Sequence, residues 1–171
     1  TGHTITGSTV NFNGTGAQTV PAFNFNNLTI SGARAANNVT LVNGGTIGVA
    51  GIFNPIATFA GGNYVVTNNT VNFNGSGAQT IPAFNYFNLT SSNVGARTLA
   101  NSGIIGIASV FTPGTNVYTI AGSTVSYNGT SPQTLNCSYG DLAAGEGRTV
   151  VVQASTDFDA CAVYNNTATA D

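Results

Sequence analysis

The acidic side chains that could act together in catalysis or metal binding lie near the C-terminus. Asp157 and Asp159 are separated by one residue, so on a strand their carboxylates would face the same side. Such a pair could act on a glycosidic bond or supply oxygen ligands to calcium. No acidic residue precedes Asp141 in the chain to complete either site. Two solvated carboxylates are the favoured interpretation, and we predict no catalytic residue, no metal site and no cofactor.

Other reactive side chains are scarce. The chain has no lysine, which excludes a Schiff-base lysine, and its single histidine, His3, has no acidic partner before Asp141 for a triad or a zinc site. The three basic residues are Arg34, Arg97 and Arg148, on a chain of net charge −2. They supply no basic surface for nucleic acid. We predict that the protein is not an enzyme and binds no nucleic acid.

Cys137 and Cys161 are the only cysteines, and both lie in the last third of the chain. A disulfide between them would close a loop of about 25 residues and contribute roughly 3 kcal/mol in the chain-entropy model. Two buried free thiols are the alternative. A lysine-free composition rich in threonine and asparagine favours an extracellular chain, so we predict the disulfide and a secreted or cell-surface location.

Asparagine offers a further chemistry, N-linked glycosylation. The chain contains nine Asn-x-Ser/Thr sequons, where composition alone gives roughly five. Several of these asparagines also fit turns, which is the simpler explanation. A surface so short of charge nevertheless needs another source of solubility, and glycan would supply it. The possible acceptors are Asn13, Asn27, Asn38, Asn68, Asn74, Asn88, Asn128, Asn136 and Asn165.

The chain that must position these residues has an unusual composition. Asn, Thr, Ser and Gly account for 82 of its 171 residues, and only 5 % of residues are charged, against about 25 % in ordinary domains. A hydrophobic content of 42 % is still enough for a core. No apolar run approaches the ~18 residues of a membrane span, so no membrane insertion is expected.

An internal repeat organises the sequence. Residues 9–28 (TVNFNGTGAQTVPAFNFNNL) and 70–89 (TVNFNGSGAQTIPAFNYFNL) are identical at 16 of 20 positions, and 124–142 form a weaker third copy. We predict a three-copy β-repeat region over residues 1–142, with units starting near 3, 64 and 118. The divergent acidic segment 143–171 is expected to be a cap or joint packed on the same domain.

Each unit has the pattern of β-strands. Val-x-Phe and Val-x-Tyr segments alternate apolar and polar residues, an Asn-Gly turn signal follows each, and no segment has helical spacing. The units are short for free-standing sandwiches, which usually need about 100 residues, so their apolar faces would be buried by stacking. We predict an all-β repeat solenoid, a right-handed parallel β-helix with coils of roughly 18–25 residues. A tandem β-sandwich with Asn-Gly hairpin turns is the alternative.

Stacked coils would also explain the low charge. Equivalent side chains of successive coils lie about 4.7–4.9 Å apart. Like charges at that spacing repel each other. Thr, Ser and Asn can stack there and form hydrogen bonds instead.

The run V-x-F-N-G-x-G-A-Q-T-[VI]-P, followed by N-L-T and G-A-R, resembles the β-strand repeats of very large secreted bacterial surface proteins. The resemblance covers about residues 1–135, in two good copies and one weak copy. It implies a cell-surface, adhesin-like or structural role and a parallel β-helix, and it carries over no catalytic residue. Residues 143–171 depart from the pattern.

We therefore expect an extracellular structural or adhesive protein, either the subunit of a head-to-tail surface filament or part of an adhesin stalk. The first unit begins in register without a polar cap, and an open coil end would invite stacking of another copy. A carbohydrate-binding module is the alternative, in which repeated aromatic rings stack on sugars rather than on one another. The candidate stacking residues are Tyr64, Tyr86, Tyr118 and Tyr139, with His3 and Phe25 at equivalent positions.

Overall fold

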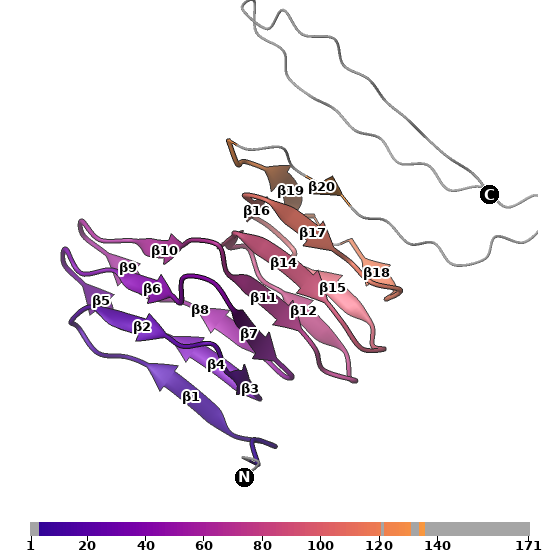
Figure 1. Ribbon diagram of the computed structural model, residues 1–171, viewed down its shortest axis with the longest axis horizontal. Coiled ribbons are helices and arrows are strands. Elements are labelled where there is room, and N and C mark those ends of the chain that lie inside the picture. The colour runs from indigo at the N-terminus through magenta and orange to yellow at the C-terminus, as the bar shows by residue number, and fades with distance from the viewer. Residues whose placement is uncertain (1–3, 121, 131–133, 136–171) are drawn as a thin grey trace, which may run out of the picture. The chain divides into compact units, whose positions relative to one another are not determined.

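The computed structural model describes residues 4–120, 122–130 and 134–135, all within the compact unit Thr1–Gly140. Every regular element among them is a β-strand, and the described strand pairs are all parallel (Figure 1). Thr9 pairs with Asn27, and Leu28 pairs with Phe53, so successive coils stack with their strands in register. The predicted all-β solenoid is confirmed. The sandwich alternative is wrong, because hairpins would make neighbouring strands antiparallel.

The described chain forms six coils, each with one strand on each of three sides. The first three coils contain β1 (Thr9–Phe12), β2 (Gln18–Val20) and β3 (Asn24–Phe25); then β4 (Asn27–Ile30), β6 (Val39–Leu41) and β7 (Thr46–Val49); then β8 (Phe53–Pro55), β10 (Tyr64–Val66) and β11 (Thr70–Phe73). The last three contain β12 (Gln79–Ile81), β13 (Asn85–Tyr86) and β14 (Asn88–Ser91); then β15 (Arg97–Leu99), β16 (Ile104–Ile107) and β17 (Val110–Thr112); then β18 (Tyr118–Thr119), β19 (Thr124–Tyr127) and β20 (Thr134–Leu135). A short pair, β5 (Ala33–Arg34) and β9 (Thr58–Phe59), lies at a corner of the second and third coils.

One sheet runs through all six coils, in the order β3-β7-β11-β14-β17-β20. Each of the other two sides is divided into two three-stranded sheets. The first half holds β1-β4-β8 and β2-β6-β10, and the second half holds β12-β15-β18 and β13-β16-β19. The six-stranded sheet is therefore the ladder that joins the two halves.

The sequence repeat does not correspond to a whole number of coils. Its Thr-Val-x-Phe/Tyr strand is the first strand of the first coil as β1, the third strand of the third coil as β11, and the second strand of the sixth coil as β19. Each repeat thus advances by two full turns and two further sides. Equivalent sequences therefore lie on three different sides of the solenoid.

The core lies inside the coils. Along β11, Val71 and Phe73 point inward and are fully buried, while Thr70 and Asn72 point outward. This alternation is the period-two pattern seen in the sequence. Aromatic rings fill the middle of the core, where Phe84 packs edge to face on Tyr86 with 5.1 Å between ring centroids. Burial of each such side chain contributes about 1.5–3 kcal/mol.

The Asn-Gly steps are corners at which successive coils come very close. A Cβ atom on Gly75 would lie well under 3.0 Å from the carbonyl oxygen of Ala50 in the coil below. A Cβ atom on Gly129 would meet the carbonyl oxygen of Ala108 in the same way. Glycine is required at these corners because its missing side chain lets the two backbones approach.

Candidate functional site

No cluster of catalytic or metal-binding side chains occurs in the described part of the chain. Residues 4–120, 122–130 and 134–135 contain no group of three His, Cys, Asp or Glu side chains. In the same residues, no helix is long and apolar enough to cross a membrane. The following predicted residues lie outside the described ones: His3, Asn136, Cys137, Tyr139, Arg148, Asp157, Asp159, Cys161 and Asn165.

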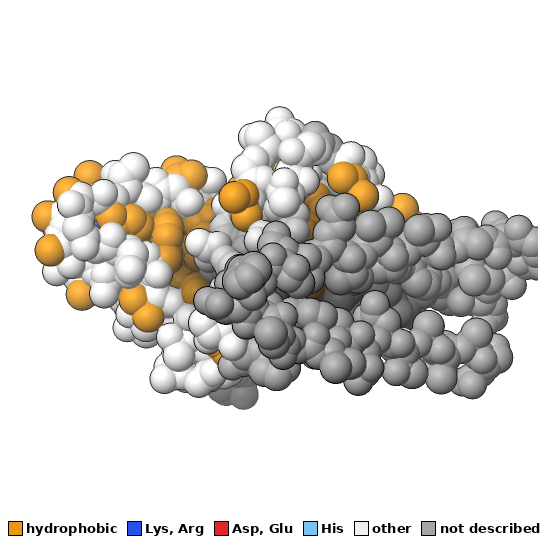
Figure 2. Space-filling model, turned by 90° about the horizontal axis from the view of Figure 1, so that it is seen from above, with side chains coloured by type: hydrophobic (Ala, Val, Ile, Leu, Met, Phe, Trp, Pro, Cys, Tyr) orange, Lys and Arg blue, Asp and Glu red, His pale blue; other side chains and the backbone are white. Residues whose placement is uncertain are grey.

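Short neutral side chains cover the outer face of the six-stranded sheet. Thr46 pairs in register with Thr70, which pairs with Asn88, and one step along the strands Asn72 pairs with Thr90. Neighbouring strands lie about 4.8 Å apart, so these side chains form close-spaced columns. Figure 2 shows a described surface made mainly of uncharged polar and backbone atoms, with scattered hydrophobic side chains.

Side-chain hydrogen bonds link such residues between coils, both on the β1-β4-β8 sheet and on the six-stranded sheet. The Nδ2 atom of Asn27 donates to Oγ1 of Thr9 at 3.3 Å, and Asn88 donates to Thr70 in the same way at 3.4 Å. Neutral residues thus occupy the stacked positions at which like charges would repel each other. This agrees with the low charge content of the sequence.

A second link spans two coils and recurs in the repeat. Nδ2 of Asn74 donates to Oδ1 of Asn24 at 3.3 Å, although the coil containing Gly48 lies between them. A Cβ atom on Gly48 would lie under 3.0 Å from both amides. We name this arrangement the asparagine clasp. The equivalent clasp joins Asn128 to Asn85 at 3.2 Å over Gly106.

Arg97 is a buried cation bound by backbone carbonyls. The guanidinium donates to the carbonyl oxygens of Phe73 at 3.2 Å, Gly75 at 3.0 Å and Ser92 at 3.0 Å, and its Nε donates to the Ser91 hydroxyl at 2.7 Å. Its side chain is 0 % exposed. Burial lowers the pKa of the guanidinium. The arginine therefore joins coil corners inside the fold and presents no charge to a ligand.

Arg34 binds the matching corner of the first repeat. It donates to the carbonyl oxygens of Phe12, at 3.1 Å, and Ser31, which are the equivalents of two Arg97 acceptors. Arg34 and Arg97 both belong to the repeated Gly-Ala-Arg motif, but nothing in that motif predicts that these cations are internal.

Among the described stacking candidates, the aromatic rings are wholly or partly inside the fold. Tyr86 is fully buried, and its hydroxyl donates to the Pro82 carbonyl at 3.1 Å, so this ring is not available to a sugar. Tyr64 and Tyr118 are half-buried. The Tyr118 hydroxyl donates to the Pro113 carbonyl at 2.9 Å. Burial raises the pKa of all three phenols, that of Tyr86 well above 10.0.

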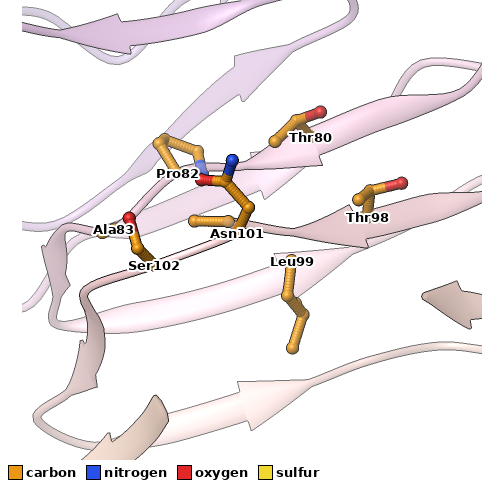
Figure 3. A pocket seen from close by; sticks show the side chains of 8 residues that line it. Thr80, Pro82, Ala83, Thr98, Leu99, Asn101 and Ser102 are labelled. Carbon is orange, nitrogen blue, oxygen red and sulfur yellow. The ribbon is translucent and has the colours of Figure 1, made fainter. Parts of the chain in front are cut away.

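An open pocket of about 500 Å³ lies on the outer side of β12 and β15. Thr80 and Thr98 are register partners and lie side by side, while Leu99 points to the opposite side of the strand (Figure 3). Asn101 and Ser102 add an amide and a hydroxyl at the strand ends. All lining groups are neutral, so the pocket suits a hydrogen-bonding, uncharged ligand.

The described sequons differ in how their asparagines are used. Four donate Nδ2 to a side chain of another coil: Asn27, Asn74, Asn88 and Asn128. Three others are exposed: Asn13, Asn38 and Asn68. A glycan is attached through Nδ2, so in the first group its bulk would lie at a bond between coils, whereas the second group offers an exposed side chain.

No protein-family model, no curated protein and no solved structure matches this chain.

Proposed function

We propose that the chain is a structural module of a secreted or cell-surface protein, a neutral β-solenoid that forms part of an adhesive stalk or surface filament. The observation that carries this proposal is the continuous six-stranded sheet, which links six coils by backbone hydrogen bonds. The asparagine clasps add bonds that span two coils. A fold stabilised between neighbouring coils extends by adding coils, which is the property a stalk needs.

The outer surface supports the same role. The described coils expose threonine and asparagine in regular columns and keep both of their arginines inside. Hydroxyl and amide groups bond to neutral polymers without strong salt dependence, because no ion pair is involved. The resemblance to repeats of bacterial surface proteins points to the same setting.

Carbohydrate binding is the second candidate, favoured by the open pocket at Thr80 and Thr98. Thr80 and Thr98 are register partners, and Asn101 lines the same pocket, so it offers hydroxyl and amide groups that could bond to sugar hydroxyls. Stacking on Tyr86 does not contribute, because that ring is buried.

Electron microscopy and a glycan array of the purified full chain would test the two roles. The structural role predicts filaments or end-to-end rods and no saturable glycan binding. A monodisperse particle with saturable binding that is lost in Thr80→Val and Thr98→Val would overturn it in favour of the carbohydrate-binding role. Val94→Thr, an exposed site away from the pocket, is the control that should leave binding unchanged.

A further inference from the structure

We propose that the first coil, residues 9–25, is the receiving half of a coil-to-coil joint. Its partner is a further coil of this repeat type. That coil would place a strand with the pattern apolar-Gly-apolar-Ala beneath β1, in the same way that β7 lies beneath β11. The inference rests on the proposed structural role, which it makes specific. In the described part of the chain, nearly the same sequence lies on a further coil in the second repeat and not in the first. The internal joint of the second repeat is therefore a template for the first coil.

Apolar side chains that the second repeat buries are exposed in the first. Val10 is 38 % exposed, whereas its equivalent Val71 is 0 % exposed against β7. Phe23 is 37 % exposed, whereas its equivalent Phe84 is 8 % exposed. The two sequences are nearly the same. Among the described residues a coil lies beneath the second copy and not beneath the first, and this accounts for the difference in exposure. A docking coil would remove this apolar surface from water.

The segment leading into each copy gives a second, independent sign. Before the second and third copies this segment forms β10 and β18, which pair with β6 and β15 of the coil beneath. Residues 4–6, the described part of the first copy's lead-in, form no strand. The lead-in therefore becomes a strand where a lower coil offers backbone partners, and in the first copy no such partner is described.

Polar groups of the first coil are also placed for a partner. In the second repeat, Nε2 of Gln79 donates to the carbonyl oxygens of Val49 and Gly51 in the coil below, both at 2.8 Å. The equivalent Gln18 keeps the contact between its Oε1 atom and the Gly14 amide, at 3.1 Å. A lower coil would supply the two carbonyl oxygens that its Nε2 lacks among the described residues.

The clasps specify which strand must lie beneath. Asn74 and Asn128 reach across a glycine in the coil below them, Gly48 in β7 and Gly106 in β16. Asn13 is their equivalent in the first copy. The partner strand therefore needs glycine at its centre between two buried apolar residues, as Ile47 and Val49 flank Gly48.

The test adds such a coil in the natural register. Residues 9–69 are placed directly before Thr9 of the chain in place of residues 1–8, which reproduces the native junction between Asn69 and Thr70. Amide hydrogen exchange is then measured along Thr9–Phe12 of the original copy, with Thr70–Phe73 of the same molecule as the internal standard. A matched extension carries Gly48→Val in the added repeat only.

Docking predicts that exchange along Thr9–Phe12 slows at least about tenfold and approaches that of Thr70–Phe73, because the strand gains a partner. The Gly48→Val extension should restore fast exchange there without changing Thr70–Phe73. Unchanged fast exchange in the extended chain would overturn the proposal. Neither result depends on the microscopy or glycan binding that tests the structural role.

Discussion

Asn24 and Asn74 are hydrogen-bonded to each other at 3.3 Å although a complete coil separates them. The bond is possible because Gly48, in the intervening coil, has no side chain to occupy the space between the two amides. Three successive coils are thereby fixed in one register by three small residues.

Gly48→Ala tests this relationship. Its Cβ atom would collide with both amides, so we expect a loss of about 1–3 kcal/mol in the free energy of unfolding. In an Asn24→Ala background one of the two obstructing amides is absent, and the cost of Gly48→Ala should fall by roughly 1 kcal/mol. Urea denaturation of the parent, the two single variants and the double variant measures this coupling. Strictly additive changes in the free energy of unfolding would contradict the clasp.

Two glycines of one corner provide a matched pair for the coil-stacking contact. A Cβ atom on Gly75 would strike the Ala50 carbonyl oxygen, whereas a Cβ atom on Gly77 would meet nothing within 4 Å. We expect Gly75→Ala to destabilise the fold by about 1–3 kcal/mol, because backbone has to move. Gly77→Ala should change the melting temperature little. Calorimetry compares them, and equal effects would be inconsistent with close coil contact at Gly75.

Arg97 is expected to be essential for stability. Replacing it by Met leaves the carbonyl oxygens of Phe73, Gly75 and Ser92 without their donor, which should cost at least about 3 kcal/mol. Arg97→Lys keeps the charge but loses the planar fork of donors, so it should retain part of the stability. Denaturant unfolding ranks the variants. If the Met variant were as stable as the parent, hydrophobic packing would be an adequate substitute for the bound cation.

The sequence predicted the architecture well but not the interior polar groups. The repeat at Thr9 and Thr70, with its period-two alternation, was enough to predict stacked strands and the length of the coils. The roles of Gly48 and Arg97 were not predictable in the same way, because they depend on which coil lies beneath a strand. The repeat contained a usable signal: Asn24 and Gly48 recur as Asn85 and Gly106, at matching places in the next unit.

Stability should depend on tyrosine ionisation at high pH. Burial raises the folded-state pKa of Tyr86 well above 10.0, whereas in the unfolded chain it ionises near about 10. The folded state therefore retains the proton longer. Its contribution is fully present below about pH 10 and is lost as the pH rises further. Unfolding free energies between pH 8 and 11, with Tyr86→Phe as the comparison, would measure it. The unfolding free energy of Tyr86→Phe should decrease less steeply with rising pH than that of the parent. An equal pH dependence in the two proteins would contradict this account.

In a glycosylating host, glycan occupancy of a sequon should depend on whether the Nδ2 atom of its asparagine already forms a hydrogen bond to another coil. We expect folded chains to carry glycan at Asn13, Asn38 or Asn68, which are exposed, and none at Asn74, whose Nδ2 forms the clasp. Glycopeptide mass spectrometry of the secreted protein reads the occupancy. Thr15→Ala, which removes the Asn13 sequon without changing the asparagine, is the control. Stoichiometric glycan at Asn74 in a folded chain would contradict the expectation.

The advance of two turns and two sides for each repeat has a consequence for any surface the repeat encodes. Duplicating a unit does not build a stripe along one flank, because each new copy is rotated to another side, as β1, β11 and β19 already are. Three repeats complete a whole number of turns, so a longer array would show the same motif in every direction around its axis. Such an array could be approached from any side, and gene duplication could lengthen it without placing identical residues directly above one another.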